Sequence, residues 1–167
     1  MIRDETSGDE AAIDAVIAAA FRGHPYSQQR EGELVDALRA SGGLTVSLVA
    51  VEDGEIVGQV AFSPVTINGA HEGWFGLGPV AVLPARQGHG IGRALIEAGL
   101  ARVRALGRAG CVLVGDAAFY RRFGFRADPG LTFKGVPPEH FMALSLGPER
   151  TLPTGEVRFH PAFDAVS

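Results

Sequence analysis

The sequence has one cysteine, one lysine and no long hydrophobic run, and these absences exclude several classes of protein. With Cys111 alone, the chain cannot form an internal disulfide, which is typical of proteins from a reducing compartment. No apolar stretch reaches the ~20 residues that span a bilayer. Residues 1–21 also lack the basic start and unbroken apolar run of a signal peptide. We therefore expect a cytoplasmic protein without a membrane partner.

Size and composition predict one globular domain. A chain of 167 residues can bury a substantial core. Its 46% of hydrophobic and 20% of charged residues are ordinary for a globular protein. No internal repeat, low-complexity tract or linker divides the chain. We expect a single domain over residues 1–167.

Positive charge is concentrated in one part of an acidic chain. The net charge is −4, yet residues 86–126 carry eight arginines against two acidic residues. That segment is therefore +6 and the remainder is −10. An acidic chain argues against a nucleic-acid partner, whereas a local basic cluster favours a small polyanion. For Arg102, Arg104 and Arg108 we prefer a simpler interpretation, the solvated face of a helix.

Apolar periodicity predicts the helices. Ile13, Val16 and Ile17 have helical spacing, and Ser7 with Glu10 resembles a capping box before them. Similar apolar stripes, ended by glycines, indicate the other helices. The predicted helices cover residues 7–21, 31–38, 91–106 and 117–123.

Runs of β-branched and aromatic residues predict a sheet. Asp53-Gly54 and Asn68-Gly69 are typical two-residue hairpin turns, and strands joined by such turns are antiparallel. The helix over residues 91–106 separates two strands that we expect to be parallel, joined by a right-handed crossover. The predicted strands cover residues 45–51, 56–65, 72–75, 77–83, 111–114 and 141–146. With an irregular tail after Gly147, the fold class is α+β, with a mixed, largely antiparallel sheet and flanking helices.

A glycine-rich turn joins the strand over residues 77–83 to the next helix. Gly88, Gly90 and Gly92 leave the backbone amides of this turn uncovered by side chains. A helix N-terminus adds unpaired N–H donors and partial positive charge, and Gln87 and Arg93 can add side-chain donors. The turn therefore predicts a phosphate site, although close packing of a helix on a strand also uses glycine.

Two other phosphate-binding loops do not match this turn. A dinucleotide-binding fold needs Gly-x-Gly-x-x-Gly after the first strand of a βαβ unit. Here the glycine spacing differs and antiparallel hairpins precede the turn. A P-loop needs Gly-Lys followed by Ser or Thr, but the only lysine is Lys134. Both of these nucleotide-binding classes are excluded.

Two segments resemble conserved segments of a known family. Gln87-x-x-Gly90-x-Gly92, at the start of a helix, is similar to the acetyl-CoA signature of the GCN5-related N-acetyltransferases (GNAT). Residues 115–125, Gly-Asp-Ala-Ala-Phe-Tyr-Arg-Arg-Phe-Gly-Phe, resemble the family's second segment, in which a tyrosine precedes a Gly-Phe turn. Residues 77–82 and 157–163 resemble the YhbS-like bacterial branch. The resemblance covers nearly the whole chain and implies the GNAT acyl-CoA N-acyltransferase fold.

The resemblance implies that acetyl-CoA is the acyl donor. Family members lay the pantetheine arm along the strand before the loop. That strand and the one over residues 112–114 then splay apart around the thioester, and the loop amides take the pyrophosphate. The implied cofactor-binding residues are Val80, Ala81, Val82, Gln87, Gly88, His89, Gly90, Ile91, Gly92 and Arg93.

The resemblance also places Tyr120 at the position of the family's general acid. A phenol is protonated at neutral pH and can donate to a departing thiolate, while the Val82 amide can polarise the thioester carbonyl. From the residues alone, a core tyrosine between Phe119 and Phe123 is the simpler interpretation. Many relatives carry a glutamate in the strand before the loop, but residues 74–82 contain no carboxylate, so the general base stays open. Candidates are Glu31, Glu33, Glu72 and Asp116, the last also at a helix-capping position.

We expect an N-acetyltransferase that moves acetyl from acetyl-CoA directly to a primary amine of a small molecule or peptide in a ternary complex. The alternative is a catalytically silent acyl-CoA-binding sensor or interaction module, because the strand lacks a carboxylate. No metal is expected, since the five histidines show no ligand spacing, and Cys111 is interpreted as a core residue. The amine acceptor, unidentified, is expected to contact the first two helices and residues 23–29 and 128–141. A homodimer is common in the family.

Overall fold

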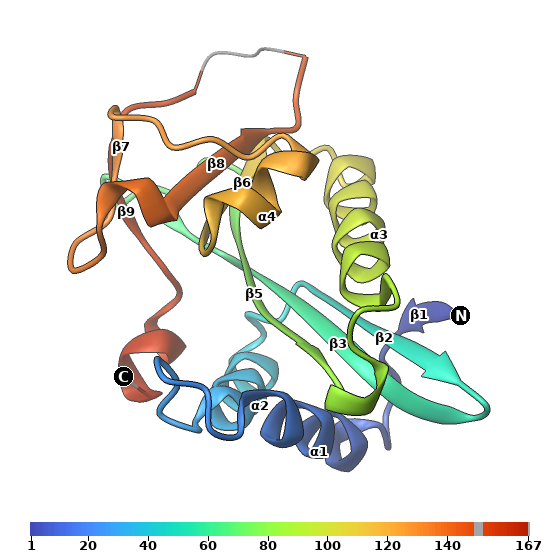
Figure 1. Ribbon diagram of the computed structural model, residues 1–167. Helices are drawn as coiled ribbons and strands as arrows, with labels where there is room; N and C mark the ends of the chain where they lie inside the picture. The colour runs from blue at the N-terminus through green and yellow to red at the C-terminus, as the bar shows by residue number, and fades with distance from the viewer. Residues whose placement is uncertain (149–151, 167) are drawn as a thin grey trace.

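The structure is a computed structural model that describes residues 1–148 and 152–166. Its main sheet has the strand order β1-β2-β3-β5-β6-β8, and a smaller sheet has the order β4-β9-β7 (Figure 1). The strands are β1 Ile2–Asp4, β2 Val46–Glu52, β3 Glu55–Pro64, β4 Thr66–Ile67, β5 Trp74–Val82, β6 Gly110–Val114, β7 Leu131–Thr132, β8 Phe141–Ser145 and β9 Gly155–Arg158. The α-helices are α1 Glu10–Phe21, α2 Glu31–Ser41, α3 Ile91–Ala105 and α4 Ala117–Tyr120. Short 3₁₀ helices are η1 Pro84–Arg86, η2 Arg121–Phe123, η3 Pro138–His140 and η4 Pro161–Val166.

The hairpin turns predicted from the sequence are confirmed. Asp53 and Gly54 have φ of 52° and 79°, and Asn68 and Gly69 have φ of 51° and 81°. Positive φ at both central residues gives a tight turn whose twist matches that of paired strands. The first turn joins antiparallel β2 and β3, and the second follows β4.

Strands β5 and β6 pair over a short length and then separate. Their parallel ladder ends at Gly76 and Val112, and in the described chain nothing else pairs them. β5 stays on β3 instead, through a register shift between Val60 and Phe62. Figure 1 shows the lower part of β5 running away from β6 toward the loop before α3. The expected parallel crossover and the splay are both confirmed.

Helices cover both faces of the main sheet. Neighbouring residues of a strand point to opposite faces. Leu48 and Val60 pack with α3, whereas Val49 and Ala61 pack with α1 and α2. The α3 side chains in the core are Leu95, Ile96, Leu100 and Val103. Those of α1 and α2 are Ile13, Val16, Ile17 and Val35. The apolar stripes that predicted the helices are thus the faces that they bury.

The first helix begins later than predicted. Its N-cap residue is Asp9, so the prediction of a capping box formed by Ser7 and Glu10 is wrong. The Asp9 carboxylate accepts from the Thr6 amide at 2.7 Å, and the Glu10 carboxylate accepts from the Gly8 amide at 2.9 Å. These two local hydrogen bonds turn the chain before the helix and fix where it begins.

Other boundaries also differ from the prediction. The strands predicted over residues 72–75 and 77–83 are one strand, β5, because Gly76 stays extended and pairs with a neighbour on each side. The helix predicted over residues 117–123 becomes 3₁₀ after Tyr120. Strands β1, β4 and β7 were not predicted, and each is only two or three residues long.

The described part of the tail after Gly147 has secondary structure, so the prediction of an irregular tail is wrong. β9 pairs with β4 and β7, and η4 packs against α2. A Cβ on Gly76 would lie 2.6 Å from the Phe159 ring, and one on Gly43 would lie 2.7 Å from His160. The tail therefore contacts Gly76 of β5, at the point where β5 leaves β6, and Gly43 in the loop between α2 and β2.

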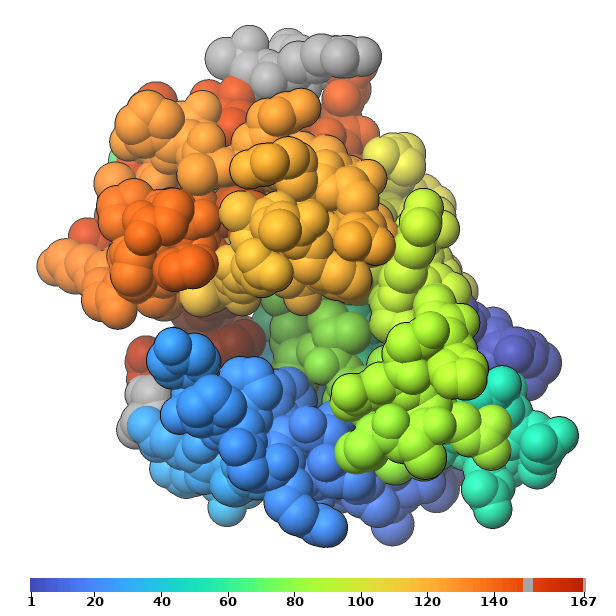
Figure 2. All heavy atoms as spheres, in the orientation of Figure 1, coloured from blue at the N-terminus to red at the C-terminus, as the bar shows by residue number. Residues whose placement is uncertain are grey.

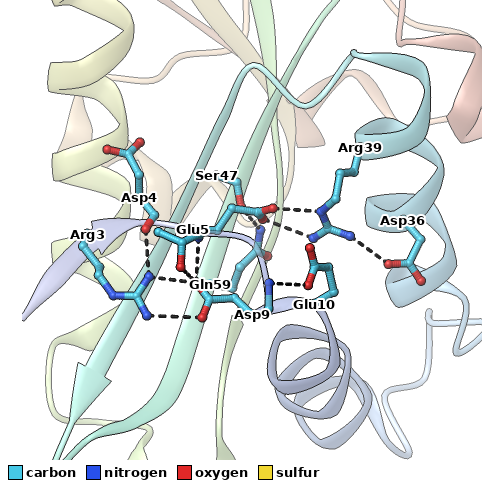
Figure 3. Close-up of polar contacts among 11 residues, drawn as sticks. Arg3, Asp4, Glu5, Asp9, Glu10, Asp36, Arg39, Ser47 and Gln59 are labelled. Carbon is cyan, nitrogen blue, oxygen red and sulfur yellow. Dashed lines mark hydrogen bonds and ion pairs between the residues drawn. The ribbon is translucent and has the colours of Figure 1, made fainter.

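A polar cluster ties the segment after β1 to α2 and to the sheet (Figure 3). Arg39 donates to both carboxylate oxygens of Glu5, at 2.8 and 3.1 Å, and to Asp36 at 2.9 Å. Glu5 also accepts from the Ser47 hydroxyl, which accepts from Gln59 Nε2 at 3.1 Å. Because Ser47 and Gln59 are buried, the cluster supplies partners for polar groups inside the core.

Replacing Arg39 by Met should lower the free energy of unfolding by about 2 kcal/mol, because the Glu5 carboxylate, 16% exposed, loses its cation. Chemical denaturation at neutral pH measures this change. The control Arg102→Met removes an ion pair with Asp4 whose side chains are 43% and 56% exposed. It should cost less than ~1 kcal/mol. Equal losses in the two variants would contradict a special role for the Arg39 cluster.

Candidate active site

The loop between β5 and α3 depends on two glycines. Gly88 and Gly90 have φ of 81° and 83°, a region that residues with a side chain enter at a cost. Gly90 is also the cap residue of α3. No atom lies within 4 Å of the positions that their Cβ atoms would occupy. The two glycines therefore allow the conformation of the loop and leave its backbone uncovered by side chains.

The loop presents consecutive backbone amides without acceptors. Gln87 donates its amide to Pro84, and Ala94 donates to Gly90. Within the described residues, the amides between them, 88–93, find no acceptor. The later ones belong to the first turn of α3, where the helix offers no carbonyl and the end of its dipole is positive. Such a set of donors can hold an anionic group.

Gly92 is not required by the packing of the protein. It is the second residue of α3, and a Cβ there would meet only Val82 Cγ2, at the ordinary contact distance of 3.7 Å. The methyl group would point to the side on which β5 ends. The remaining predicted loop residues, His89 and Ile91, are exposed and half-buried respectively.

Beside the loop, β5 has a free backbone edge. Leu83 donates its amide to the Val57 carbonyl of β3 at 2.9 Å, and Ala81 lies in the same ladder. Alternate residues of a strand direct their polar groups to opposite edges. Val80 and Val82 therefore direct theirs toward the gap that β6 leaves.

The side chains of Gln87 and Arg93 already have partners. Gln87 Nε2 donates to the Val82 carbonyl at 3.0 Å, which ties the loop to the end of β5. Arg93 pairs with Glu97 at 3.0 Å on an exposed part of α3. The free donors of this site are thus backbone amides, and the Gln87 side chain orders the loop that carries them.

Tyr120 lies just beyond the end of β6. Its ring covers Gly115, where a Cβ would lie 2.5 Å from the ring carbon Cε2. The rings of Phe119, Phe123 and Phe125 surround it, with centroids at 4.9, 6.3 and 6.1 Å. Burial raises the pKa of the phenol. No hydrogen bond from the hydroxyl exists in the described structure, so Tyr120 is a neutral, well-packed donor without a partner.

Figure 2 shows these parts around one cleft. β5, in green, lies at its floor. α4 and the segment that follows it form one wall in orange, and the connection between α1 and α2 forms the opposite wall in blue. The glycine loop, in yellow-green, closes one end. The cleft thus brings together the predicted loop, the free strand edge and the wall that carries Tyr120.

The structure does not single out a general base. Asp116 caps α4 by accepting from the Ala118 amide at 3.1 Å, as interpreted from the sequence. Glu31 and Glu33 lie in the first turn of α2, where negative charge stabilises a helix. Glu72 is exposed and precedes β5 at the end away from the loop.

A side chain that the sequence did not indicate also reaches this region. Phe159 lies against Gly76, the last residue of β5 that is paired with β6. The alternation of Val157 and Phe159 was the available signal for a strand. Its partners, β4 and β7, are two residues long and distant in the sequence, so that signal could not show where the strand lies.

Other chemistry receives no support from the described residues. Cys111 is buried, and burial raises the pKa of its thiol to about 12, which keeps it unreactive. No group of three His, Cys, Asp or Glu residues in the described ranges is placed to hold a metal ion. None of the described helices is long and apolar enough to cross a membrane.

Known proteins similar to this chain identify its family. The family model described as "Acetyltransferase (GNAT) domain" matches residues 44–127. The Escherichia coli K12 protein "Uncharacterized N-acetyltransferase YhbS" is 40% identical over 126 residues, which are 75% of this chain and 72% of that protein.

Solved structures match nearly the whole chain. A GNAT family acetyltransferase from Brucella melitensis, in complex with acetyl-CoA, is 54% identical with a TM-score of 0.88, over 98% of this chain and 97% of that one. YhbS from Escherichia coli, in complex with CoA, is 35% identical with a TM-score of 0.90, over 98% and 91%. The family and the fold expected from the sequence are confirmed. The chain belongs to the GNAT family of acetyltransferases.

Proposed function

We propose that this chain transfers the acetyl group of acetyl-CoA directly to a primary amine in a ternary complex. One observation carries the proposal: the free edge of β5 is followed, after the short helix η1, by the amides of residues 88–93, which have no acceptor among the described residues. Acetyl-CoA presents complementary groups in the same order, an arm with two amides and then a pyrophosphate. The Brucella melitensis and Escherichia coli relatives, which are in complex with acetyl-CoA and CoA, support it.

Backbone groups do most of the binding in this proposal. The pantetheine arm pairs with Val80 and with the amide of Val82, whose carbonyl already accepts from Gln87, while Ala81 stays in the ladder with β3. The pyrophosphate takes the amides of residues 88–93, where the helix end favours negative charge. The amine enters between the two walls of the cleft in Figure 2, which include residues 23–29 and 128–141.

The reaction forms one N–C bond and breaks one C–S bond. The uncharged amine attacks the thioester carbonyl, whose oxygen accepts from a free amide of β5 as negative charge develops on it. The C–S bond then breaks, and the leaving thiolate takes the proton of the Tyr120 phenol. The raised pKa keeps Tyr120 protonated at neutral pH. The proton that the amine loses passes to water, and water returns one to the tyrosine.

Binding and thiol release together test this function. Calorimetry should show that acetyl-CoA and CoA bind and that ATP does not. Release of free thiol from acetyl-CoA should then rise with at least one member of a panel of alkylamines, amino sugars and peptides with free N-termini. If neither acetyl-CoA nor CoA binds, the glycine loop is only a turn and the proposal fails.

Replacing Gly92 by Ala should weaken acetyl-CoA binding at least about tenfold without lowering stability. The methyl group fits the protein, with Val82 at 3.7 Å, but it obstructs the approach to the amides. Disturbing a hydrogen bond to a charged group costs ~1.5–3 kcal/mol, which is a factor of about ten or more. Calorimetry and thermal melting measure the two effects.

Gly32→Ala is the matched control for this prediction. Gly32 is also the second residue of its helix, and a Cβ there would meet only Asp14, at 3.5 Å. This variant should keep the affinity of the unchanged protein. Equal affinities of the Gly92 and Gly32 variants for acetyl-CoA would show that the phosphate is held elsewhere.

Replacing Tyr120 by Phe should lower kcat by ~10²–10⁴-fold, the usual contribution of a general acid. The ring packing with Phe119 and Phe125 is kept, so acetyl-CoA affinity and melting temperature should change little. Steady-state kinetics with the first amine found active, beside calorimetry, separate the two effects. Unchanged turnover would leave Tyr120 as a packing residue only.

A further inference from the structure

The end of the gap between β5 and β6 is covered by the Phe159 ring. A Cβ on Gly76 would lie 2.6 Å from Phe159 Cε1 and 2.7 Å from Cδ1, with Val65 Cγ1 at 3.2 Å. Gly76 is paired with Val112 at the last rung of the parallel ladder. The ring therefore lies against the backbone at the point where the two strands meet.

Packing on both sides holds this ring in place. Phe133 meets it edge to face at a centroid distance of 4.9 Å, and Phe163 lies at 5.1 Å. The chain before Phe159 is fixed by β9 and the chain after it by η4 on α2. A side chain anchored in this way cannot swing aside easily, so it sets a fixed boundary.

The direction of the bound arm leads the acyl group to that boundary. With the pyrophosphate at residues 88–93, the arm runs along β5 from Val82 to Val80 and onward toward Gly76. The acyl group is at the far end of the arm. It therefore points to the closed end of the gap, where β5 and β6 meet.

We infer that the Phe159 ring limits the length of the acyl group that the site accepts, an inference that rests on the proposed function. Ser63 is the partner of Gly76 in the ladder with β3, so its side chain lies on the face of the sheet that the ring covers. Ser63 is fully buried, and its hydroxyl has no partner among the described residues. Removing the ring would open a space beside it into which a longer chain can extend.

The test compares the affinities of CoA, acetyl-CoA, propionyl-CoA and butyryl-CoA by calorimetry, which needs no acceptor. The unchanged protein should bind acetyl-CoA and lose affinity as the chain lengthens. Phe159→Ala should bind CoA as before and butyryl-CoA about tenfold more tightly than the unchanged protein does, since each methylene in a closed pocket is worth a factor of ~10 or more. Phe159→Leu keeps an apolar side chain in the tail and should change the affinities in the same direction, by less.

Val166→Ala is the control from the same tail. Val166 packs with the α2 cluster and is not among the rings that hold Phe159, so this variant should keep the chain-length preference of the unchanged protein. If acetyl-CoA binds but both Phe159 variants keep the chain-length preference of the unchanged protein, the inference is overturned and the proposed function is not. An unchanged protein that binds none of the thioesters would overturn the proposed function, and this inference with it.

Discussion

The separation of β5 from β6 beyond Gly76 and Val112 is the constraint on which the rest of the site depends. A strand inside a sheet normally pairs along both edges, because unpaired buried amides and carbonyls are costly. Here β5 keeps β3 on one side and leaves the other edge open as far as Val82. Residues 83–90, which include η1, join that strand to α3, and the Gln87 side chain ties this loop to the end of β5. The open edge and the positive helix end therefore lie next to each other.

Charged side chains contribute less to this surface than the arginine-rich segment over residues 86–126 suggested. Arg86 pairs with Glu52 at 3.2 Å, and Arg93 pairs with Glu97. Arg102 reaches Asp4, which fits the interpretation of that arginine as part of a helix face. The donors that face the cleft at the loop are backbone amides, and their number and direction are set by glycine. A phosphate site of this kind needs no lysine, which agrees with the presence of only Lys134 in the chain.

Much of the fold was predictable because its signals are local. The turn at Asp53-Gly54 needs positive φ at both residues, and the stripe of α3 repeats over four turns, so each could be recognised without its partners. The glycine loop was predictable for the same reason. The role of Tyr120 was not predictable from its neighbours alone, because a tyrosine suits both a packed aromatic position and a general acid. The family resemblance decided between these two roles. The tail was missed because its pairing and its contact with Gly76 are long-range and leave only a weak alternation around Val157.

The position of the tail has a consequence for how the protein is made. Residues 155–166 leave the ribosome after the glycines, the α2 surface and the short strands that they cover. A nascent chain can therefore complete both layers of helices around the sheet while the junction of β5 and β6 is still open on one side. The cleft therefore gets its final shape only after residues 155–166 have been synthesised and have packed against Gly76 and α2.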